Sequence, residues 1–255
     1  MKKVIILLFF GALFSCQLGQ KRKKQGNNHL ILGVSLLKKC DNQRALTHLR
    51  QAVKLNKKDP LAHHTLAVAY FALEEYALSE KSLKNALKWN DQLTESRVTL
   101  AKVYLNQKKI GKALKVLSVA KKDLTYPGYF KISNLLGEAY FKRKDWLLAR
   151  KWFTEASRQP KGMNQCFTYT YLGQVEFELK NYKSSVDFLN KAAAFCQKQK
   201  KHCKKQKYPE QYFLARSYVK LNKKSRSKYH LKIFLQRTDK TDPLFAKAKA
   251  LLQTL

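Results

Sequence analysis

Apolar residues recur at the three- and four-residue spacing of amphipathic helices from about residue 26 to the end of the chain. In each of six segments, a small residue is followed sixteen positions later by a large apolar one. The small residues are Gly33, Ala67, Ala101, Gly137, Gly173 and Ala215, and the large ones are Leu49, Leu83, Leu117, Phe153, Leu189 and Leu231. Small residues let two helices approach closely, and large ones fill the space between helix pairs. The pattern therefore predicts an all-α protein built from antiparallel helix pairs.

The six segments repeat with a nearly constant period. They start near residues 26, 60, 94, 130, 166 and 208, so that the first three follow one another at 34 residues. This period and pattern resemble the tetratricopeptide repeat, in which two antiparallel helices form each unit and the units stack into a superhelix. Residues 26–241 are therefore predicted to form six units. Asp242 and Pro243 have the residue types of an N-cap and a first helical position, so residues 242–255 are predicted to form a capping helix.

The N-terminus is typical of an export signal. Lys2 and Lys3 precede an apolar run of eleven residues, which is short of the about 20 that a transmembrane helix needs. The sequence Leu-Phe-Ser-Cys ending at Cys16 resembles the bacterial lipobox, in which the cysteine is acylated and begins the mature protein. We therefore expect a lipoprotein signal peptide at 1–15 and a lipid on Cys16. A cleaved signal with an incidental cysteine is the alternative. Because Gln17 rather than aspartate follows, the expected location is the outer membrane, facing the periplasm.

A polar, basic segment follows this cysteine. Residues 16–25 lack apolar periodicity and contain four consecutive basic residues, so we expect a tether lying against anionic lipid headgroups. Over the whole chain, 52 basic residues outnumber 17 acidic ones, and the formal net charge is +35. In a cytosolic protein such an excess would indicate nucleic acid as a partner. An exported lipoprotein has little access to nucleic acid, so the expected anionic neighbours are lipids, lipopolysaccharide or an acidic partner.

In tetratricopeptide proteins, the first helix of each unit lines a concave groove where partners usually bind. The inward positions of the first three units, read by repeat phase, are mostly apolar: Leu30, Val34, Leu37, His64, Val68, Phe71, Val98 and Leu105. They predict a groove that accepts an amphipathic helix or apolar peptide of a partner protein. Packing of these residues inside the protein or against the tether is the alternative. The inward face of the later units is mixed and includes Phe177, Tyr212 and Arg216.

Four cysteines remain beyond the lipobox. Cys166 opens the fifth unit and Cys196 closes its second helix, so antiparallel geometry favours a disulfide between them. A disulfide between Cys196 and Cys203 is the alternative, and Cys40 is expected to be a free thiol. A metal site made by Cys196, His202 and Cys203 would have too few ligands at suitable spacing, so no metal is expected.

No motif of an enzyme or of a cofactor site is present. His63 and His64 have no carboxylate or nucleophile paired with them in the pattern, and the chain has no glycine-rich phosphate loop. We therefore expect neither enzymatic activity nor a cofactor. The lysine-rich insertion from Lys198 to Lys207 is expected to be a solvated loop, with contact to anionic lipid or to an acidic partner as the alternative.

The lipobox, the tether and the six units together resemble the type IV pilus pilotin lipoproteins. The more specific elements are the uninterrupted 34-residue phase of the first three units and the insertion "DLTYPGYF" before "NLLGEAYFKRKDWLLARKWFTEA". The resemblance implies a monomeric outer-membrane lipoprotein that binds secretin subunits through the groove and promotes their localisation and multimerisation for pilus biogenesis. Two other functions are open: a general envelope adaptor that scaffolds another assembly, and a surface protein that binds polyanions.

Overall fold

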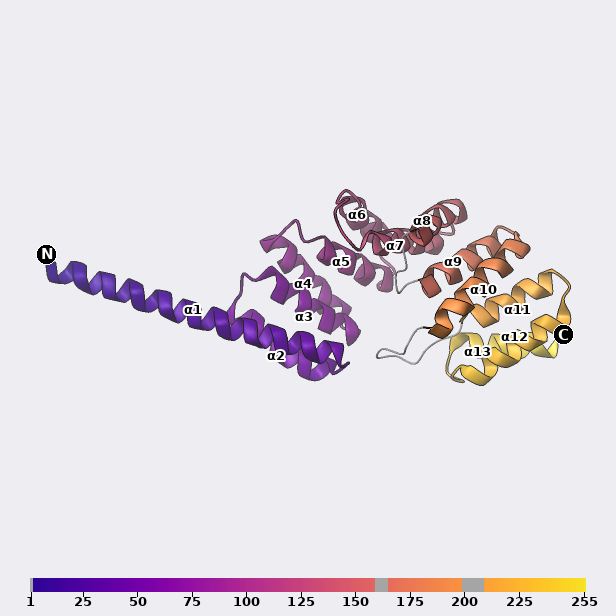
Figure 1. The fold of residues 1–255 in the computed structure, drawn as a ribbon, viewed down its shortest axis with the longest axis horizontal. Coiled ribbons are helices and arrows are strands. Elements are labelled where there is room, and N and C mark those ends of the chain that lie inside the picture. Colours follow the sequence, from indigo (N-terminus) through magenta and orange to yellow (C-terminus); the bar gives the residue numbers. More distant parts are fainter. Residues whose placement is uncertain (1, 159–164, 199–208) are drawn as a thin grey trace. The chain divides into compact units, whose positions relative to one another are not determined.

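The computed structural model describes residues 2–158, 165–198 and 209–255, with side chains described from residue 19 onward except at residue 198. In this part of the chain all regular structure is helical, which confirms the predicted all-α class (Figure 1). The helices are α1 (Lys2–Lys38), α2 (Asn42–Leu55), α3 (Pro60–Ala72), α4 (Tyr76–Trp89), α5 (Thr94–Asn106), α6 (Ile110–Ala120), α7 (Tyr129–Lys142), α8 (Trp146–Arg158), α9 (Gln165–Glu178), α10 (Tyr182–Lys198), α11 (Pro209–Lys220), α12 (Lys224–Arg237) and α13 (Pro243–Gln253).

The helices form two compact units, Met1–Val116 and Leu117–Leu255. In the first unit α1 pairs with α2 and α3 with α4, and α5 packs on α4. In the second unit α7 pairs with α8, α9 with α10 and α11 with α12. The first helices of successive pairs also contact one another: α1 touches α3, α3 touches α5, α7 touches α9 and α9 touches α11. Each unit therefore has a face made by the first helices of its pairs.

The turn inside each pair has one backbone geometry. The second of its three residues adopts a positive φ of 57° to 66°, at Cys40, Glu74, Lys108, Lys144, Lys180 and Asn222. After α3, the Glu74 N–H donates to the Phe71 carbonyl at 3.1 Å and the Glu75 N–H donates to the Tyr70 carbonyl at 2.9 Å. The same two bonds close the other five turns. This Schellman arrangement satisfies the last carbonyls of the first helix and reverses the chain within a few residues.

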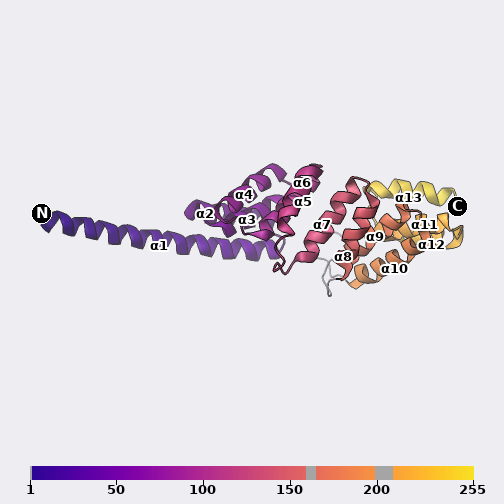
Figure 2. The same ribbon diagram turned by 90° about the horizontal axis from the view of Figure 1, so that it is seen from above.

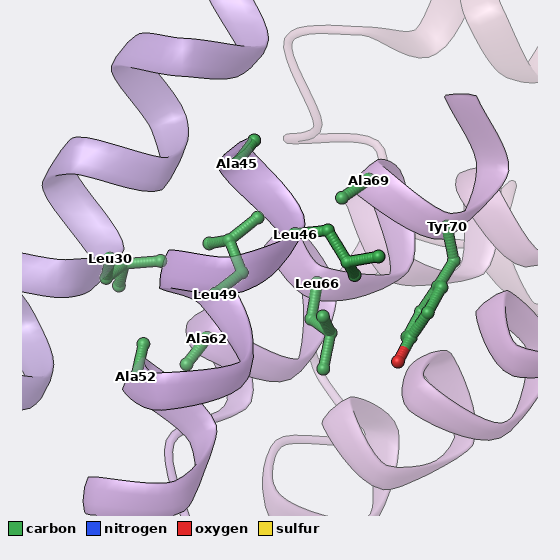
Figure 3. Close-up of a cluster of buried hydrophobic side chains, with 9 residues drawn as sticks. All are labelled: Leu30, Ala45, Leu46, Leu49, Ala52, Ala62, Leu66, Ala69 and Tyr70. Carbon is green, nitrogen blue, oxygen red and sulfur yellow. The ribbon is translucent and has the colours of Figure 1, made fainter. Parts of the chain in front are cut away.

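Close approach of the paired helices depends on the small residues of the sequence pattern. A Cβ built on Gly33 would lie 2.6 Å from Leu49, and one built on Gly137 would lie 2.7 Å from the Phe153 ring. In the first unit, Leu49 lies in a cluster of buried side chains from α1, α2 and α3 (Figure 3). The cluster comprises Leu30, Ala45, Leu46, Leu49, Ala52, Ala62, Leu66, Ala69 and Tyr70.

Three buried serines add a polar link between paired helices. The hydroxyls of Ser79, Ser185 and Ser227 donate to the carbonyls of Ala67, Gly173 and Ala215 at 2.8, 2.7 and 3.0 Å, respectively. Each acceptor is the carbonyl of the small residue of the pair, Ala67, Gly173 or Ala215, whose small size lets the second helix approach closely. The serine therefore fixes the register of the second helix on the first.

Helix α13 covers the last helix pair. Asp242 is its N-cap and accepts from the Leu244 N–H at 2.9 Å, and Pro243 occupies the first turn, as the sequence predicts. Ala248 is buried with Tyr212, Leu231 and Phe234. Figure 2 shows α13 alongside α11 and α12, which it contacts.

The segment predicted to be a tether is helical. Residues 16–25 belong to α1, whose N-terminal part extends beyond the other helices of the first unit (Figure 1). Lysine, arginine and glutamine lose little side-chain freedom in a helix, so the packed part of α1 can propagate backward through them. In the described part of the chain, we find no helix with both the length and the apolar character needed to cross a membrane.

A disulfide joins Cys166 and Cys196, with their Cα atoms 4.9 Å apart. It links the start of α9 to the end of α10, as the antiparallel pairing predicts. The structure does not describe the alternative partner Cys203 or the side chain of Cys16. Of the insertion from Lys198 to Lys207, it describes only the backbone of Lys198. Cys40 is also disulfide-bonded, so the expectation of a free thiol there is wrong.

Candidate functional site

Five of the eight predicted groove residues lie at least partly at the surface of the first unit. Val34 and Leu37 on α1 pack against the edge of the buried cluster, while Val68 and Phe71 on α3 are half-buried. His64 is half-buried as well, and its Nδ1 lies 2.9 Å from the Ser96 hydroxyl of α5. We call the set Val34, Leu37, His64, Val68 and Phe71 the α1–α3 surface. Helices α1 and α3, which carry these residues, contact each other.

The other three predicted groove residues are core residues. Leu30, Val98 and Leu105 are only 4%, 0% and 1% exposed, so a partner cannot contact them without unfolding the site. Leu30 lies under α2, beside Leu49 in the cluster of Figure 3. Repeat phase identifies equivalent backbone positions, but the exposure of each position also depends on the size of its neighbours. These three residues therefore do not line a groove as predicted, and they stabilise the fold as part of the buried core.

Sequence reasoning missed two exposed apolar residues among the described side chains of α1, Ile31 and Leu32. Ile31 is 61% exposed and precedes Val34 by about one helical turn, so it extends the α1–α3 surface. Leu32 is 44% exposed, whereas its equivalents Leu66 and Leu100 are 7% and 4% exposed. Leu32 belongs to the first helix pair, which has no earlier pair to cover it.

A pocket lies within the second unit. Phe177 of α9, Tyr212 and Arg216 of α11, and Leu251 of α13 line a pocket of about 460 Å³. Repeat phase placed the first three on the inward face, but it gave no reason to expect a pocket. The pocket needs α13, whose position against α11 comes from tertiary packing.

In the residues that the structure describes, no cluster of three or more histidines, cysteines and acids could hold a metal ion. Burial would raise the pKa of Glu80, but hydrogen bonding and the charges of Lys84 and Lys109 hold it below its usual value. Lys84 and Lys109 form ion pairs with Glu80, at 2.7 and 3.6 Å. The Tyr104 hydroxyl of α5 also donates to Glu80 at 3.2 Å, so this network links α4 to α5.

The comparisons with known proteins agree with this fold. The tetratricopeptide-repeat family model matches residues 32–92 and 98–162. Among solved structures, PilF of Pseudomonas aeruginosa is 17% identical and has a TM-score of 0.73, with 91% of this chain and 99% of that chain covered. PilW, described as a widely conserved type IV pilus biogenesis factor, is 14% identical and has a TM-score of 0.74, with 88% and 98% covered. A search of curated proteins found no match.

The fold is shared beyond pilus proteins. One chain of the APC/C hetero-tetramer Cut9–Hcn1 is 17% identical to this chain and has a TM-score of 0.78. The match covers 95% of this chain but 45% of that chain. The chain is a tetratricopeptide-repeat protein, a class that acts by binding other proteins. Its fold is like that of PilF and PilW over nearly their whole length.

Proposed function

We propose that this protein is a pilotin: an outer-membrane lipoprotein, anchored through Cys16, that binds secretin subunits and promotes their localisation and multimerisation for type IV pilus biogenesis. The observation that carries the proposal is the fold match to PilF and PilW, which spans 99% and 98% of those chains. The lipobox at Cys16 and the basic residues after it support attachment to a membrane. The protein acts as an adaptor and not as an enzyme.

The α1–α3 surface is the proposed site for the secretin subunit. Its aliphatic and aromatic side chains lie on two neighbouring helices and remain partly exposed. An amphipathic helix laid along such a surface buries its apolar face against them. Ile31 adds exposed apolar area beside Val34. Because the contact is mainly apolar, binding should persist at high ionic strength.

The test is carried out in a strain lacking the gene for this protein. Unheated membrane fractions are separated on a denaturing gel and blotted for the pilus secretin. The proposal predicts loss of the secretin multimer with persistence of the monomer, restored by the wild-type protein but not by Cys16→Ala. An unchanged multimer in the deletion strain would overturn the pilotin assignment.

Variants of the surface locate the binding site. Val34→Asp and Phe71→Asp should each fail to restore the multimer, because an ionised carboxylate would have to be buried against the secretin helix. Leu147→Asp is the control, since Leu147 is an apolar residue of the second unit that is 62% exposed. Circular dichroism of the purified variants must show equal helix content. If the Val34→Asp and Phe71→Asp variants restore the secretin multimer, the secretin subunit binds elsewhere on the protein.

The match to a chain of the Cut9–Hcn1 hetero-tetramer favours a second candidate, a general envelope adaptor that scaffolds a different assembly. This fold serves assemblies other than pili, so the same apolar surface could hold another partner. Crosslinking from a photoreactive residue at Ile31, followed by identification of the captured envelope protein, separates the candidates. A secretin adduct supports the pilotin function, and a different envelope protein supports the general adaptor.

A further inference from the structure

The pocket of the second unit is built from two helical stripes that face each other across an aromatic floor. Tyr212, Arg216 and Lys220 follow one another at four-residue spacing on α11, and Lys247 and Leu251 do so on α13. Phe177, at the end of α9, completes the floor. Phe177 and Tyr212 are only 9% and 7% exposed, so the floor is fixed by packing.

Arg216 is held in place by aromatic rings. Its guanidinium carbon lies 4.3 Å from the Phe177 ring centroid and 5.9 Å from the centroids of Tyr212 and Phe213. These contacts hold the guanidinium against the aromatic floor, and its N–H groups can donate to an anion beside it. The side chain is therefore preorganised for a planar anion such as a carboxylate.

The pocket contains three cations and no acidic side chain. Arg216, Lys220 and Lys247 are among its lining residues, and every other lining residue is uncharged. Within the described part of the chain, none of the ion pairs involves these three residues. Three like charges around one small cavity repel one another, and an anion in the cavity would relieve that repulsion.

From this geometry we infer that the pocket binds an acidic peptide segment of a partner protein, with one apolar side chain inserted and adjacent carboxylates at the rim. The apolar side chain lies between the aromatic floor and Leu251, and a carboxylate accepts two hydrogen bonds from Arg216 while Lys220 and Lys247 neutralise its neighbour. The apolar floor and the volume of about 460 Å³ favour a side chain with a carboxylate over a bare inorganic anion. This site lies wholly in the second unit and uses charge, so it is independent of the α1–α3 surface.

Isothermal titration with three peptides tests the inference on the full chain. The probes are acetyl-Ser-Glu-Leu-Asp-Ser-amide, its neutral form acetyl-Ser-Gln-Leu-Asn-Ser-amide, and acetyl-Ser-Glu-Gly-Asp-Ser-amide, which lacks the apolar side chain. The first should bind at least tenfold more tightly than either of the others. Equal binding of the neutral peptide, equal binding of the glycine peptide, or no binding of the first peptide at millimolar concentration would each overturn the proposal.

Matched variants separate the pocket from the general positive charge. Arg216→Gln should weaken binding of the first peptide at least tenfold, and Arg216→Lys should restore only part of it, because lysine lacks the planar pair of donors. Lys224→Gln removes the same charge from an exposed site on α12, outside the pocket, and should leave the affinity unchanged. If Arg216→Gln and Lys224→Gln weaken binding of the first peptide equally, the peptide is bound by the general positive charge, and the proposed site is refuted. The secretin multimer assay reports separately on the α1–α3 surface, so failure of one proposal is distinguishable from failure of the other.

Discussion

At the scale of single residues, the helix-pair turns carry avoidable backbone strain. A positive φ is costly for residues with a Cβ, by about 1–2 kcal/mol, and none of the six turn positions is glycine. Lys144, in the turn between α7 and α8, has a φ of 61°. Lys144→Gly should therefore raise the free energy of unfolding by about 0.5–1 kcal/mol, since the entropy of glycine in the unfolded chain offsets part of the gain. Urea denaturation followed by circular dichroism measures the change.

Lys144→Ala is the matched control for that substitution. It removes the same charge but keeps the Cβ, so the strain remains and the midpoint should not rise comparably. If alanine and glycine stabilise equally, the benefit comes from the lost positive charge and not from the backbone.

A second residue-scale effect concerns Glu210, at the start of α11. Its side chain is 1% exposed, and Oε2 has no hydrogen-bond partner within the described part of the chain. Burial raises the pKa of Glu210 to about 6, although hydrogen bonds and the charge of Arg237 act in the opposite direction. The folded state therefore binds the proton more tightly than the unfolded state, and this contribution to stability is complete below about pH 4.5 and is lost as the pH rises through 6.

Glu210→Gln removes this titration. At pH 8 the variant should be more stable than the wild type by up to about 2 kcal/mol, because the neutral amide avoids burial of an ionised carboxylate. The advantage should shrink toward pH 4.5. Urea midpoints at pH 4.5, 6 and 8 provide the measurement, and an advantage independent of pH would contradict the assigned cause.

At the scale of the helix pair, the small residues are required by sterics. Gly137 on α7 faces the fully buried ring of Phe153 on α8, and a Cβ there would lie 2.7 Å from the ring. Gly137→Ala should lower the free energy of unfolding by about 1–2 kcal/mol, because overpacking outweighs the better helix propensity of alanine. Thermal unfolding by circular dichroism is a suitable assay.

Gly111→Ala supplies the control, because a Cβ on Gly111 meets no atom within 4 Å. In α6 this change should be neutral or stabilise the protein by up to about 1 kcal/mol. Destabilisation of similar size in both variants would show that the loss at Gly137 does not arise from contact with Phe153.

The helix pairs could be predicted from sequence because their signals are local. The sixteen-residue offset between Gly137 and Phe153 arises from two helices and one turn of fixed length, so residue size alone reveals the contact. Exposure at the groove could not be predicted equally well. Val98 and His64 occupy equivalent positions, yet Val98 is fully buried and His64 is half-buried. That difference depends on which side chains surround each position, and the repeat pattern does not contain this information.

At the scale of the whole molecule, the dominant electrostatic feature is a formal charge of +35. Self-repulsion of so many like charges destabilises the compact state, and salt screens it. The urea midpoint should therefore rise when sodium chloride is increased from 20 to 300 mM. A variant carrying Lys39→Gln, Lys81→Gln and Lys183→Gln, all at exposed positions, should show a shallower rise. A midpoint that falls with salt would mean that attractive ion pairs outweigh the repulsion.

The two sites differ in how far the sequence could reveal them. The α1–α3 surface consists of inward positions of the first two repeats, which repeat phase identifies from the sequence alone. The pocket of the second unit needed the position of α13, which lies outside the repeat pattern. Only tertiary packing through residues such as Ala248 brings Lys247 and Leu251 opposite Arg216.

The pairing of helices also bears on how the chain folds. Within each unit, every pair of helices found in contact lies one or two places apart along the chain, as with α3 and α4 or α9 and α11. Folding rates rise as contacts become more local, because short loops cost little entropy to close. Folding can therefore start at any helix pair and spread to its neighbours. A growing chain could acquire stable structure before its last helices have been synthesised.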